Sequence, residues 1–175
     1  AQVLAQGERP IGLFTRASDQ VDRLYKGEKF GTVIRGEDAL SSETLSSYGD
    51  GAVTIKFLDG TQLSIGPNSD VILDEYVYDA DANTGRMSLS ILSGVVKFIS
   101  GKMSSESYEI DTPVGMVAIR GTELVFLVEP DGDTSLAIVS GGVSVSLEGQ
   151  SVEASAEDGR VTLLTFAADV PGLFQ

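Results

Sequence analysis

The sequence predicts an all-β domain of short strands, arranged as a sandwich, a roll or a short solenoid built from hairpins, with little helix. Three observations predict this fold class. Apolar and polar residues alternate with a period of two in many short runs, as in half-buried strands. Glycine occurs 20 times in 175 residues, mostly at the ends of these runs. No stretch shows several turns of the 3.6-residue period that an amphipathic helix requires.

The clearest hairpin lies at residues 53–65. Apolar residues alternate with polar ones over 53–57, Asp59-Gly60 interrupts the run, and the alternation resumes over 62–65. Asp-Gly is typical of a two-residue type I′ turn, because both central positions need a positive φ, which Asp tolerates and Gly adopts freely. The pattern therefore predicts two paired strands whose alternate side chains share one core.

Similar patterns recur towards the C-terminus. Alternating runs reach Ser93-Gly94 and Gly141-Gly142 and continue beyond them, and a last strand at 161–166 follows Asp158-Gly159. Each of these pairs is interpreted as a hairpin turn. The run 123–128 is apolar on both faces, which predicts a central strand that is buried on both sides.

The absent residue types exclude several mechanisms. Without His or Cys, the chain cannot form a Ser-His-Asp triad, a Cys nucleophile, a thiolate zinc site or an imidazole proton shuttle. A glycosidase needs only two carboxylates, but 26 acidic residues make carboxylate pairs unavoidable. We therefore expect no enzymatic activity.

The net charge limits the partners. The chain has 26 acidic and 12 basic residues, a net charge of −14, which opposes binding to nucleic-acid phosphates. Residues 1–102 hold 14 acidic and 10 basic residues, a net −4, whereas 103–175 hold 12 and 2, a net −10. This charge favours cations and basic partners, and it also keeps a protein soluble. The longest apolar run has five residues, against the roughly 20 of a membrane helix, so no membrane insertion is expected.

Six short motifs follow one another along the chain. They are Gly27-Glu28, Phe57-Leu58-Asp59-Gly60-Thr61, Ile65-Gly66-Pro67-Asn68-Ser69, Leu92-Ser93-Gly94-Val95-Val96, Asp111-Thr112-Pro113-Val114-Gly115 and Ile119-Arg120-Gly121-Thr122. In this order they resemble the FecR domain, over roughly residues 20–150. Gly115 stands where the family usually has Ala, and Leu124 replaces an aromatic residue. The resemblance marks a structural motif made of Asp59, Gly60, Thr112, Pro113, Arg120, Gly121 and Thr122.

The resemblance implies an all-β module that works outside the cytoplasm, in the periplasm, secreted or at the cell surface, with no active site of its own. In signalling members the domain follows a membrane span and a cytoplasmic helical part that holds a sigma factor, and it senses an outer-membrane transporter. This sequence shows neither the span nor the helical part. The chain is therefore interpreted as a free-standing FecR-like domain.

The expected organisation has three parts. Residues 1–19 form an N-terminal extension, 20–150 the FecR-like domain, and 151–175 a last strand and a tail. The first residues, Ala1-Gln2, are typical of what remains after a signal peptidase cleaves a secretory precursor. We therefore expect an extracytoplasmic location after removal of a signal peptide.

The corner Arg120-Gly121-Thr122 is the most recognisable motif. In the structural interpretation Arg120 binds backbone carbonyls and Asp111 or Asp59, because an arginine beside a buried strand needs internal partners. Gly121 then supplies an unusual backbone angle, and Thr122 begins the central strand. The alternative is that the guanidinium group of Arg120 binds an anionic ligand.

Two acidic loops are candidate calcium sites. Asp79, Asp81 and Asn83 place oxygen atoms at alternate positions, as at the start of a calcium loop, but the position of the final bidentate Glu holds Ser90. Asp131 and Asp133 form a second acidic tip. Hairpin turns need the same residue types for conformational reasons. We therefore expect plain turns and no cofactor, with calcium as the alternative.

Two functions from different classes are compatible with these features. The first is a non-catalytic module that binds a protein or a polysaccharide outside the cytoplasm. The second is a structural subunit that assembles with copies of itself, by adding a terminus or an edge strand to the edge of the next copy. Both ends of the chain are apolar for termini, at 2–5 and 170–174.

Overall fold

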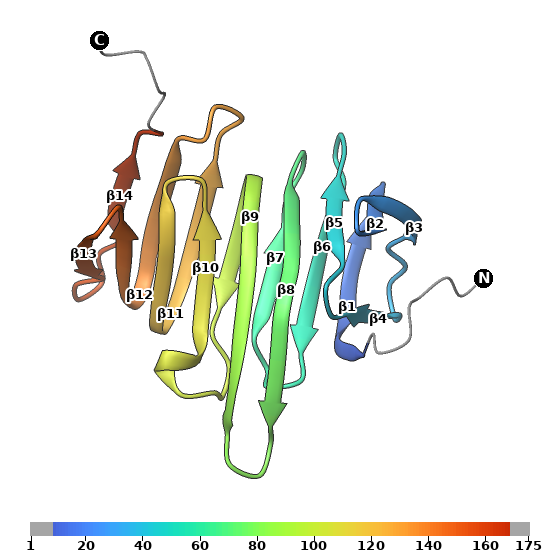
Figure 1. Ribbon diagram of the computed structural model, residues 1–175, viewed down its shortest axis with the longest axis horizontal. Coiled ribbons are helices and arrows are strands. Elements are labelled where there is room, and N and C mark those ends of the chain that lie inside the picture. The colour runs from blue at the N-terminus through green and yellow to red at the C-terminus, as the bar shows by residue number, and fades with distance from the viewer. Residues whose placement is uncertain (1–8, 169–175) are drawn as a thin grey trace.

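The chain forms fourteen strands and a single 3-10 turn within residues 9–168, which are the residues that the computed structural model describes (Figure 1). The prediction of an all-β domain with little helix is confirmed. The side chains of Ser105 and Thr122 also lie outside the description. The elements are β1 (Pro10–Ser18), β2 (Val21–Tyr25), β3 (Glu28–Thr32), β4 (Asp38–Leu40), β5 (Thr44–Ser47), β6 (Ala52–Phe57), β7 (Gln62–Ile65), β8 (Asp70–Asp79), β9 (Thr84–Ile99), η1 (Ser105–Ser107), β10 (Tyr108–Thr112), β11 (Gly115–Val128), β12 (Thr134–Leu147), β13 (Gln150–Ser155) and β14 (Thr162–Phe166).

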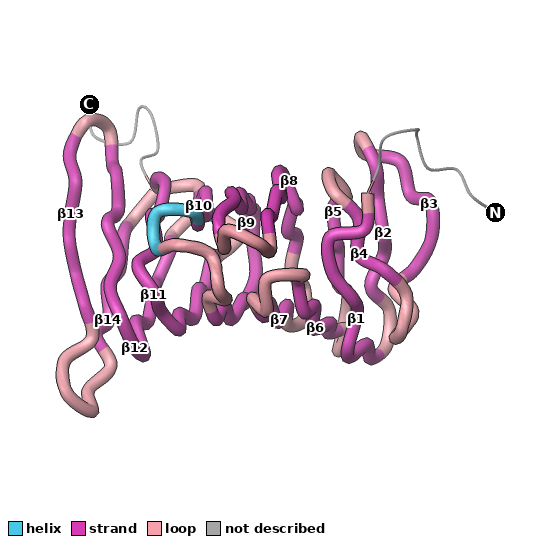
Figure 2. Tube along the Cα trace, turned by 90° about the horizontal axis from the view of Figure 1, so that it is seen from below, coloured by secondary structure: helices cyan, strands magenta, loops and turns pink. Residues whose placement is uncertain are grey.

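The strands lie in two layers, which appear as two rows in Figure 2. Layer A contains, in pairing order, β3, β2, β5, β8, the first part of β9, β10, the first part of β11, the second part of β12, and β13. Layer B contains β4, β1, β6, β7, the second part of β9, the second part of β11, the first part of β12, and β14. Among the described pairs, only β9 with β10 is parallel. The architecture is therefore a sandwich, one of the arrangements that the sequence predicts.

Three long strands pass from one layer to the other at a glycine. In β9, residues before Gly94 pair with β8 and residues after it pair with β7 and β11. Gly94, Gly121 in β11 and Gly141 in β12 all have a positive φ. The prediction of hairpin turns at Ser93-Gly94 and Gly141-Gly142 is therefore wrong. The positive φ bends the strand without reversing it, so one strand contributes to both sheets.

The core lies between the layers and is filled by alternate side chains. The alternating apolar residues of the two hairpin strands, Val53, Ile55, Phe57, Leu63 and Ile65, are all buried, as predicted. The prediction for 123–128 is half correct. Leu124 and Phe126 are fully buried, but Leu127 on the opposite face is 42% exposed. A two-layer sandwich covers only one face of each sheet, and no third layer lies over Leu127 in the part of the chain that is described.

The turn between β6 and β7 differs from the predicted type I′ turn. Its loop spans residues 58–61, where Gly60 donates a hydrogen bond to the Phe57 carbonyl (2.9 Å) and Phe57 donates one to the Thr61 carbonyl (2.8 Å). Gly60 has a φ of 90°, whereas Asp59 has no positive φ. Asp59 adopts another conformation because its side chain points into the core.

Strands outside the expected FecR-like domain at 20–150 belong to the same two layers as the strands within it. β1 falls within the expected extension at 1–19, and it pairs with β4 and β6 and buries Phe14 completely. β14 falls within 151–175 and pairs with β12. Both strands share the common core or pack against it. The apolar ends at 2–5 and 170–174 lie outside the described residues. Within the described residues, no helix has the length and hydropathy to cross a membrane.

Candidate functional site

Asp59 is the centre of a buried polar cluster. Its carboxylate is completely shielded from solvent. It accepts hydrogen bonds from the hydroxyls of Tyr76 (2.8 Å), Tyr108 (2.6 Å) and Thr61 (2.7 Å), and from the Thr61 backbone N–H (3.2 Å). A buried carboxylate requires such donors, because burial without them would cost several kcal/mol. The β6–β7 turn therefore holds a negative charge inside the sandwich.

Two tyrosines connect this turn to distant strands. Tyr76 comes from β8, and its hydroxyl also accepts a hydrogen bond from the Asp59 backbone N–H (2.9 Å). Tyr108 opens β10, and its hydroxyl accepts hydrogen bonds from the backbone N–H groups of Gly101 and Met103 (both 3.1 Å). One carboxylate thus positions the β6–β7 turn, β8, β10 and the loop at 100–104.

Burial and the neighbouring Asp59 charge both disfavour a tyrosinate anion in this cluster. Burial is the larger cause, and together they raise the pKa of Tyr108 to about 12. They shift the pKa of Tyr76 in the same direction. Every buried side-chain nitrogen and oxygen among the described residues has a partner. The Asp59 cluster is therefore a closed structural network that offers no accessible acid or base.

The residues at 112–115 close the β10–β11 turn. The Thr112 hydroxyl donates to the Gly115 carbonyl (2.8 Å) and accepts from the Gly115 N–H (3.3 Å). Pro113 between them is exposed. Thr112 and Pro113, like Asp59 and Gly60, therefore belong to turns that fix the register of neighbouring strands.

Arg120 lies on the surface, contrary to the prediction of internal partners. Its guanidinium group pairs with Glu153 of β13 at 2.8 Å, and the two side chains are about half exposed or more. No contact joins it to Asp59 or to Asp111 in the described part of the chain. Gly121 adopts a φ of 51°, where β11 passes between the layers, so the bend directs Arg120 outward. Thr122 lies in β11, and its side chain is outside the described residues.

The two acidic loops differ in how their oxygens are arranged. At the β11–β12 tip, one carboxylate oxygen from each of Glu129, Asp131 and Asp133 lies within 4.8 Å of the others. Asp131 accepts a hydrogen bond from the Asp133 N–H (3.0 Å), and Asp133 accepts one from the Ala168 N–H (2.8 Å). These bonds are what an acidic turn forms without an ion. Calcium binding at this tip stays the untested alternative to the plain turn that the sequence predicts.

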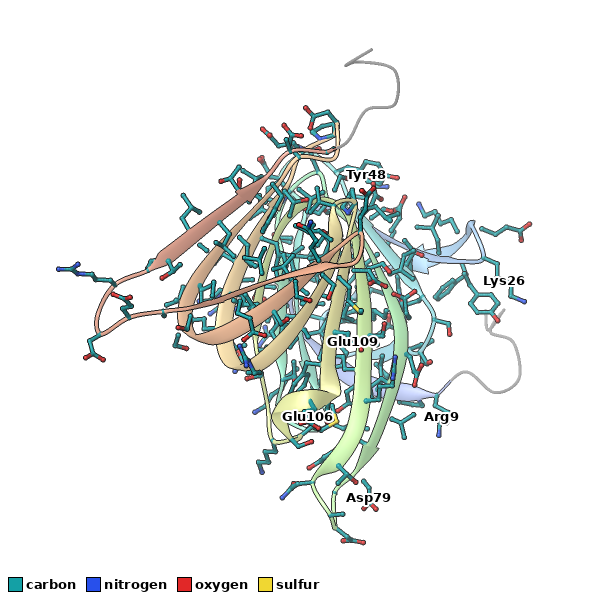
Figure 3. All side chains as sticks on the ribbon, turned by 60° about the vertical axis from the view of Figure 1, so that its left-hand side comes forward. Arg9, Lys26, Tyr48, Asp79, Glu106 and Glu109 are labelled. Atoms are coloured by element: carbon teal, nitrogen blue, oxygen red, sulfur yellow. The ribbon has the colours of Figure 1, made fainter. Side chains whose placement is uncertain are left out.

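The β8–β9 tip shows no comparable cluster in the described residues. Asp79 accepts a hydrogen bond from the Asp81 N–H (3.0 Å), and Asn83 accepts one from the Tyr78 hydroxyl (3.1 Å). Figure 3 shows Asp79 at the far end of the hairpin, pointing away from the body of the molecule. Calcium binding here also stays the untested alternative to a plain turn.

Arg23 of β2 and Glu43 form a buried ion pair, which the sequence analysis did not predict. The guanidinium group forms two hydrogen bonds of 2.7 Å to the Glu43 carboxylate, and the two side chains are only 8% and 1% exposed. Arg23 also lies over the rings of Phe14 and Phe30. The only sequence signal would be a charge among apolar strand residues, and 38 charged residues obscure it.

Comparison with known proteins identifies the family. The family model described as FecR protein matches residues 43–144, more than half of the chain. The chain belongs to the FecR family. No curated protein and no solved structure matches it significantly.

The FecR match contains the Asp59 cluster and the Arg120 corner, and it runs from the start of β5 into β12. β1 to β4, β13 and β14 therefore complete the two layers outside the matched region. The two layers have four edges, formed by β3, β4, β13 and β14. Three of these edge strands are charged or very short, which discourages pairing with another chain. β3 carries Glu28 and Lys29, β4 has only three residues, and β13 carries Glu153.

The fourth edge, β14, has none of these features. Its sequence, Thr-Leu-Leu-Thr-Phe, contains no charge, and among the described residues only one side of it pairs, with β12. Leu163 of β14 is 66% exposed. On the outer face of layer B, Leu163 lies opposite Ala137 of β12, and Ala137 lies opposite Val125 of β11. Leu127, two residues after Val125, lies opposite Val95 of β9. We call these five residues the β14 patch.

Proposed function

We propose that this FecR-family chain is a non-catalytic binding module that acts outside the cytoplasm and contacts a protein or a polysaccharide. The observation that carries the proposal is the β14 patch together with the uncharged edge of β14. Leu163, Leu127 and Val95 of this patch are exposed, and Val125 and Ala137 between them are partly buried. Exposed apolar residues that adjoin one another favour contact with another molecule. An open strand edge favours a partner that adds a strand to the sheet.

The absence of catalysis is supported by the chemistry of the residues. The sequence has no His or Cys, and the carboxylate with the most unusual surroundings, Asp59, is fully buried and bonded to three hydroxyls. A general acid or base must reach the proton that it transfers. The location outside the cytoplasm is supported by the family, whose β-domain works on that side of the membrane in its signalling members.

The alternative function is a self-assembling extracellular or cell-surface subunit. The same β14 edge favours it, because strands without charge or proline pair readily with a second copy. No charged side chain lies within β14, so two β14 strands would meet without direct like-charge repulsion. The two functions differ in what occupies the edge: another molecule, or a copy of the chain.

Light scattering combined with hydrogen exchange separates the two functions. We expect a monomer across micromolar concentrations whose β14 amides exchange rapidly on their unpaired side, which leaves the edge open for a partner. A concentration-dependent oligomer that protects these amides would support self-assembly instead. Leu163→Lys should then restore the monomer, whereas Leu58→Lys should not, because Leu58 is similarly exposed (63%) but lies in the β6–β7 turn. Protection of β14 in the dilute monomer would contradict both functions.

A further inference from the structure

A pocket of about 560 Å³ lies at the other end of layer B, among β1, β6 and the loop between β3 and β4. Its volume falls in the range of roughly 300–1,000 Å³ that is typical of small-ligand sites. It shares no residue with the β14 patch. We call it the Arg16–Arg35 pocket, after the two arginines that line it.

A β-bulge shapes this pocket. In the pairing of β1 with β6, Phe14 lies opposite Ile55 and Arg16 lies opposite Thr54, so Thr15 is an extra residue. Bulges bend a strand and redirect its side chains, and they are common beside binding sites. The bulge therefore gives Arg16 a direction that regular alternation along β1 would not.

Backbone hydrogen bonds hold Arg35 beside the bulge. The Gly36 N–H donates to the Phe14 carbonyl (2.9 Å), and the Phe14 N–H donates to the Glu37 carbonyl (3.0 Å). These two bonds fix the loop against β1 immediately next to Thr15. Both arginines are thus placed on one pocket by elements of the main fold.

The edge of β1 is open at the pocket. β4 pairs with β1 only over Pro10–Leu13, so no described strand pairs with that edge of residues 15–18. Backbone groups on such an edge are available to a ligand, as they are on any unpaired strand. Thr15, Ser18 and Thr54 are among the lining residues; the Thr15 hydroxyl donates to the Thr54 carbonyl and the Thr54 hydroxyl bonds to Ser64, and each can still accept a hydrogen bond from a ligand.

The charges of the pocket contrast with those of the chain. Arg16 and Arg35 are exposed, and among the described residues neither has an ion-pair or hydrogen-bond partner and no acidic side chain lines the pocket. The whole chain has a net charge of −14. Two unpaired guanidinium groups on one pocket of such a protein favour an anionic ligand, since each guanidinium can bind a carboxylate through two parallel hydrogen bonds.

We infer that the Arg16–Arg35 pocket binds a short acidic saccharide, of which one or two carboxylate groups contact the two arginines. The arginines bind the carboxylates, and the hydroxyl-rich lining and open backbone edge bind the sugar hydroxyls. The other lining residues, Ala17, Ala52 and Val53, are small and offer no deep apolar hole for a peptide side chain. The net charge of −14 would repel a long polyanion, so a ligand of few charges fits better. This inference rests on the proposed function for its polysaccharide partner, but it uses a different surface.

Isothermal titration calorimetry with trigalacturonic acid tests the inference. We expect the wild-type chain to bind this probe and not the neutral galactotriose. Arg16→Gln and Arg35→Gln should each weaken binding about tenfold or more, because a hydrogen bond to a charged group is lost. Lys56→Gln is the matched control: it removes one exposed positive charge from β6 outside the pocket, and it should change the affinity by less than about twofold.

Three results would overturn the inference. They are no binding of trigalacturonic acid by the wild type, equal weakening by Lys56→Gln, and equally tight binding of a triglutamate peptide, which would assign the pocket to acidic peptides. Both arginine side chains are exposed, so the variants should melt at the wild-type temperature. They should also leave the exchange of β14 unchanged. Failure at this pocket is thereby distinguished from failure of the proposal for β14.

Discussion

The Tyr108 hydroxyl donates a 2.6 Å hydrogen bond to the Asp59 carboxylate, although the two residues are 49 positions apart in the chain. Both side chains are excluded from solvent. The bond joins the β6–β7 turn to the start of β10, and the Tyr76 hydroxyl joins the same carboxylate to β8 at 2.8 Å. A carboxylate that replaces its water with three hydroxyl donors fixes the positions of all three segments.

Asp59→Asn tests how much this cluster stabilises the fold. We expect the free energy of unfolding to fall by about 1–3 kcal/mol. The three hydroxyls lose a charged acceptor, and the NH2 group of the asparagine side chain replaces a carboxylate oxygen that accepted their hydrogen bonds. Urea denaturation measures the change. Asp79→Asn, at the exposed β8–β9 tip, is the control and should have little effect. Equal stability of Asp59→Asn and the wild type would show that the charge is not needed.

The raised pKa of Tyr108 predicts a loss of stability at alkaline pH. An unfolded tyrosine titrates near pH 10, whereas Tyr108 in the folded protein titrates near 12. The folded state therefore retains a proton that the unfolded state loses, so this contribution is complete below pH 10 and is lost as the pH rises from 10 to 12. Over that interval the free energy of unfolding should fall by roughly 1–3 kcal/mol.

Urea denaturation from pH 9 to 11.5 measures this loss, with two phenylalanine variants as controls. Tyr108→Phe removes one of the two tyrosines whose pKa is raised, and it should make the dependence on pH less steep, with Tyr76 accounting for what is left. Tyr48→Phe is the matched substitution outside the Asp59 cluster, at a tyrosine that is half exposed. A Tyr108→Phe profile with the wild-type slope would assign the alkaline loss to other groups.

The buried pair Arg23 and Glu43 predicts strong coupling between two substitutions. Arg23→Met should destabilise the protein by about 3–5 kcal/mol, because it leaves a carboxylate that is 1% exposed without its cation. Adding Glu43→Gln should recover much of this loss, since the amide oxygen still accepts the hydrogen bond of the Leu40 N–H (2.7 Å). A double-mutant cycle measures the coupling, and additive effects would contradict it.

Arg120→Ala should have a small effect on stability. Its ion pair with Glu153 is about half exposed, and such pairs contribute roughly 0–1 kcal/mol. Thermal melting at low and high salt measures the change, and any difference should shrink as salt screens the pair. A loss as large as that of Arg23→Met would indicate internal partners for Arg120 and restore the interpretation from the sequence.

The positions of the strands could be predicted from the sequence, because they depend on local alternation. The passage of strands between layers and the burial of charged residues could not, because they depend on contacts with distant strands. The strands of the hairpin at 53–65 follow from a period of two, which is a local property. The alternation around Gly94 looks the same whether the chain reverses or passes to the other layer, because both need a positive φ. Likewise, the sequence shows Asp59 and Arg120 only as charged residues next to a glycine. Asp59 is buried because Tyr76 and Tyr108 from distant strands supply hydroxyl donors.

Gly94→Ala tests the passage of β9 between the layers. Gly94 has a φ of 111°, and a Cβ atom there would overlap the side chain of Ser69. Ser69 is itself fixed, since its hydroxyl accepts a hydrogen bond from the Val95 N–H (3.1 Å), so we expect a loss of about 2–4 kcal/mol. Gly121→Ala is the control for backbone strain alone, because φ is 51° there and no atom lies within 4 Å of the added Cβ; it should cost about 1 kcal/mol. Similar losses in the two variants, measured by urea denaturation, would contradict a close approach of β9 to Ser69.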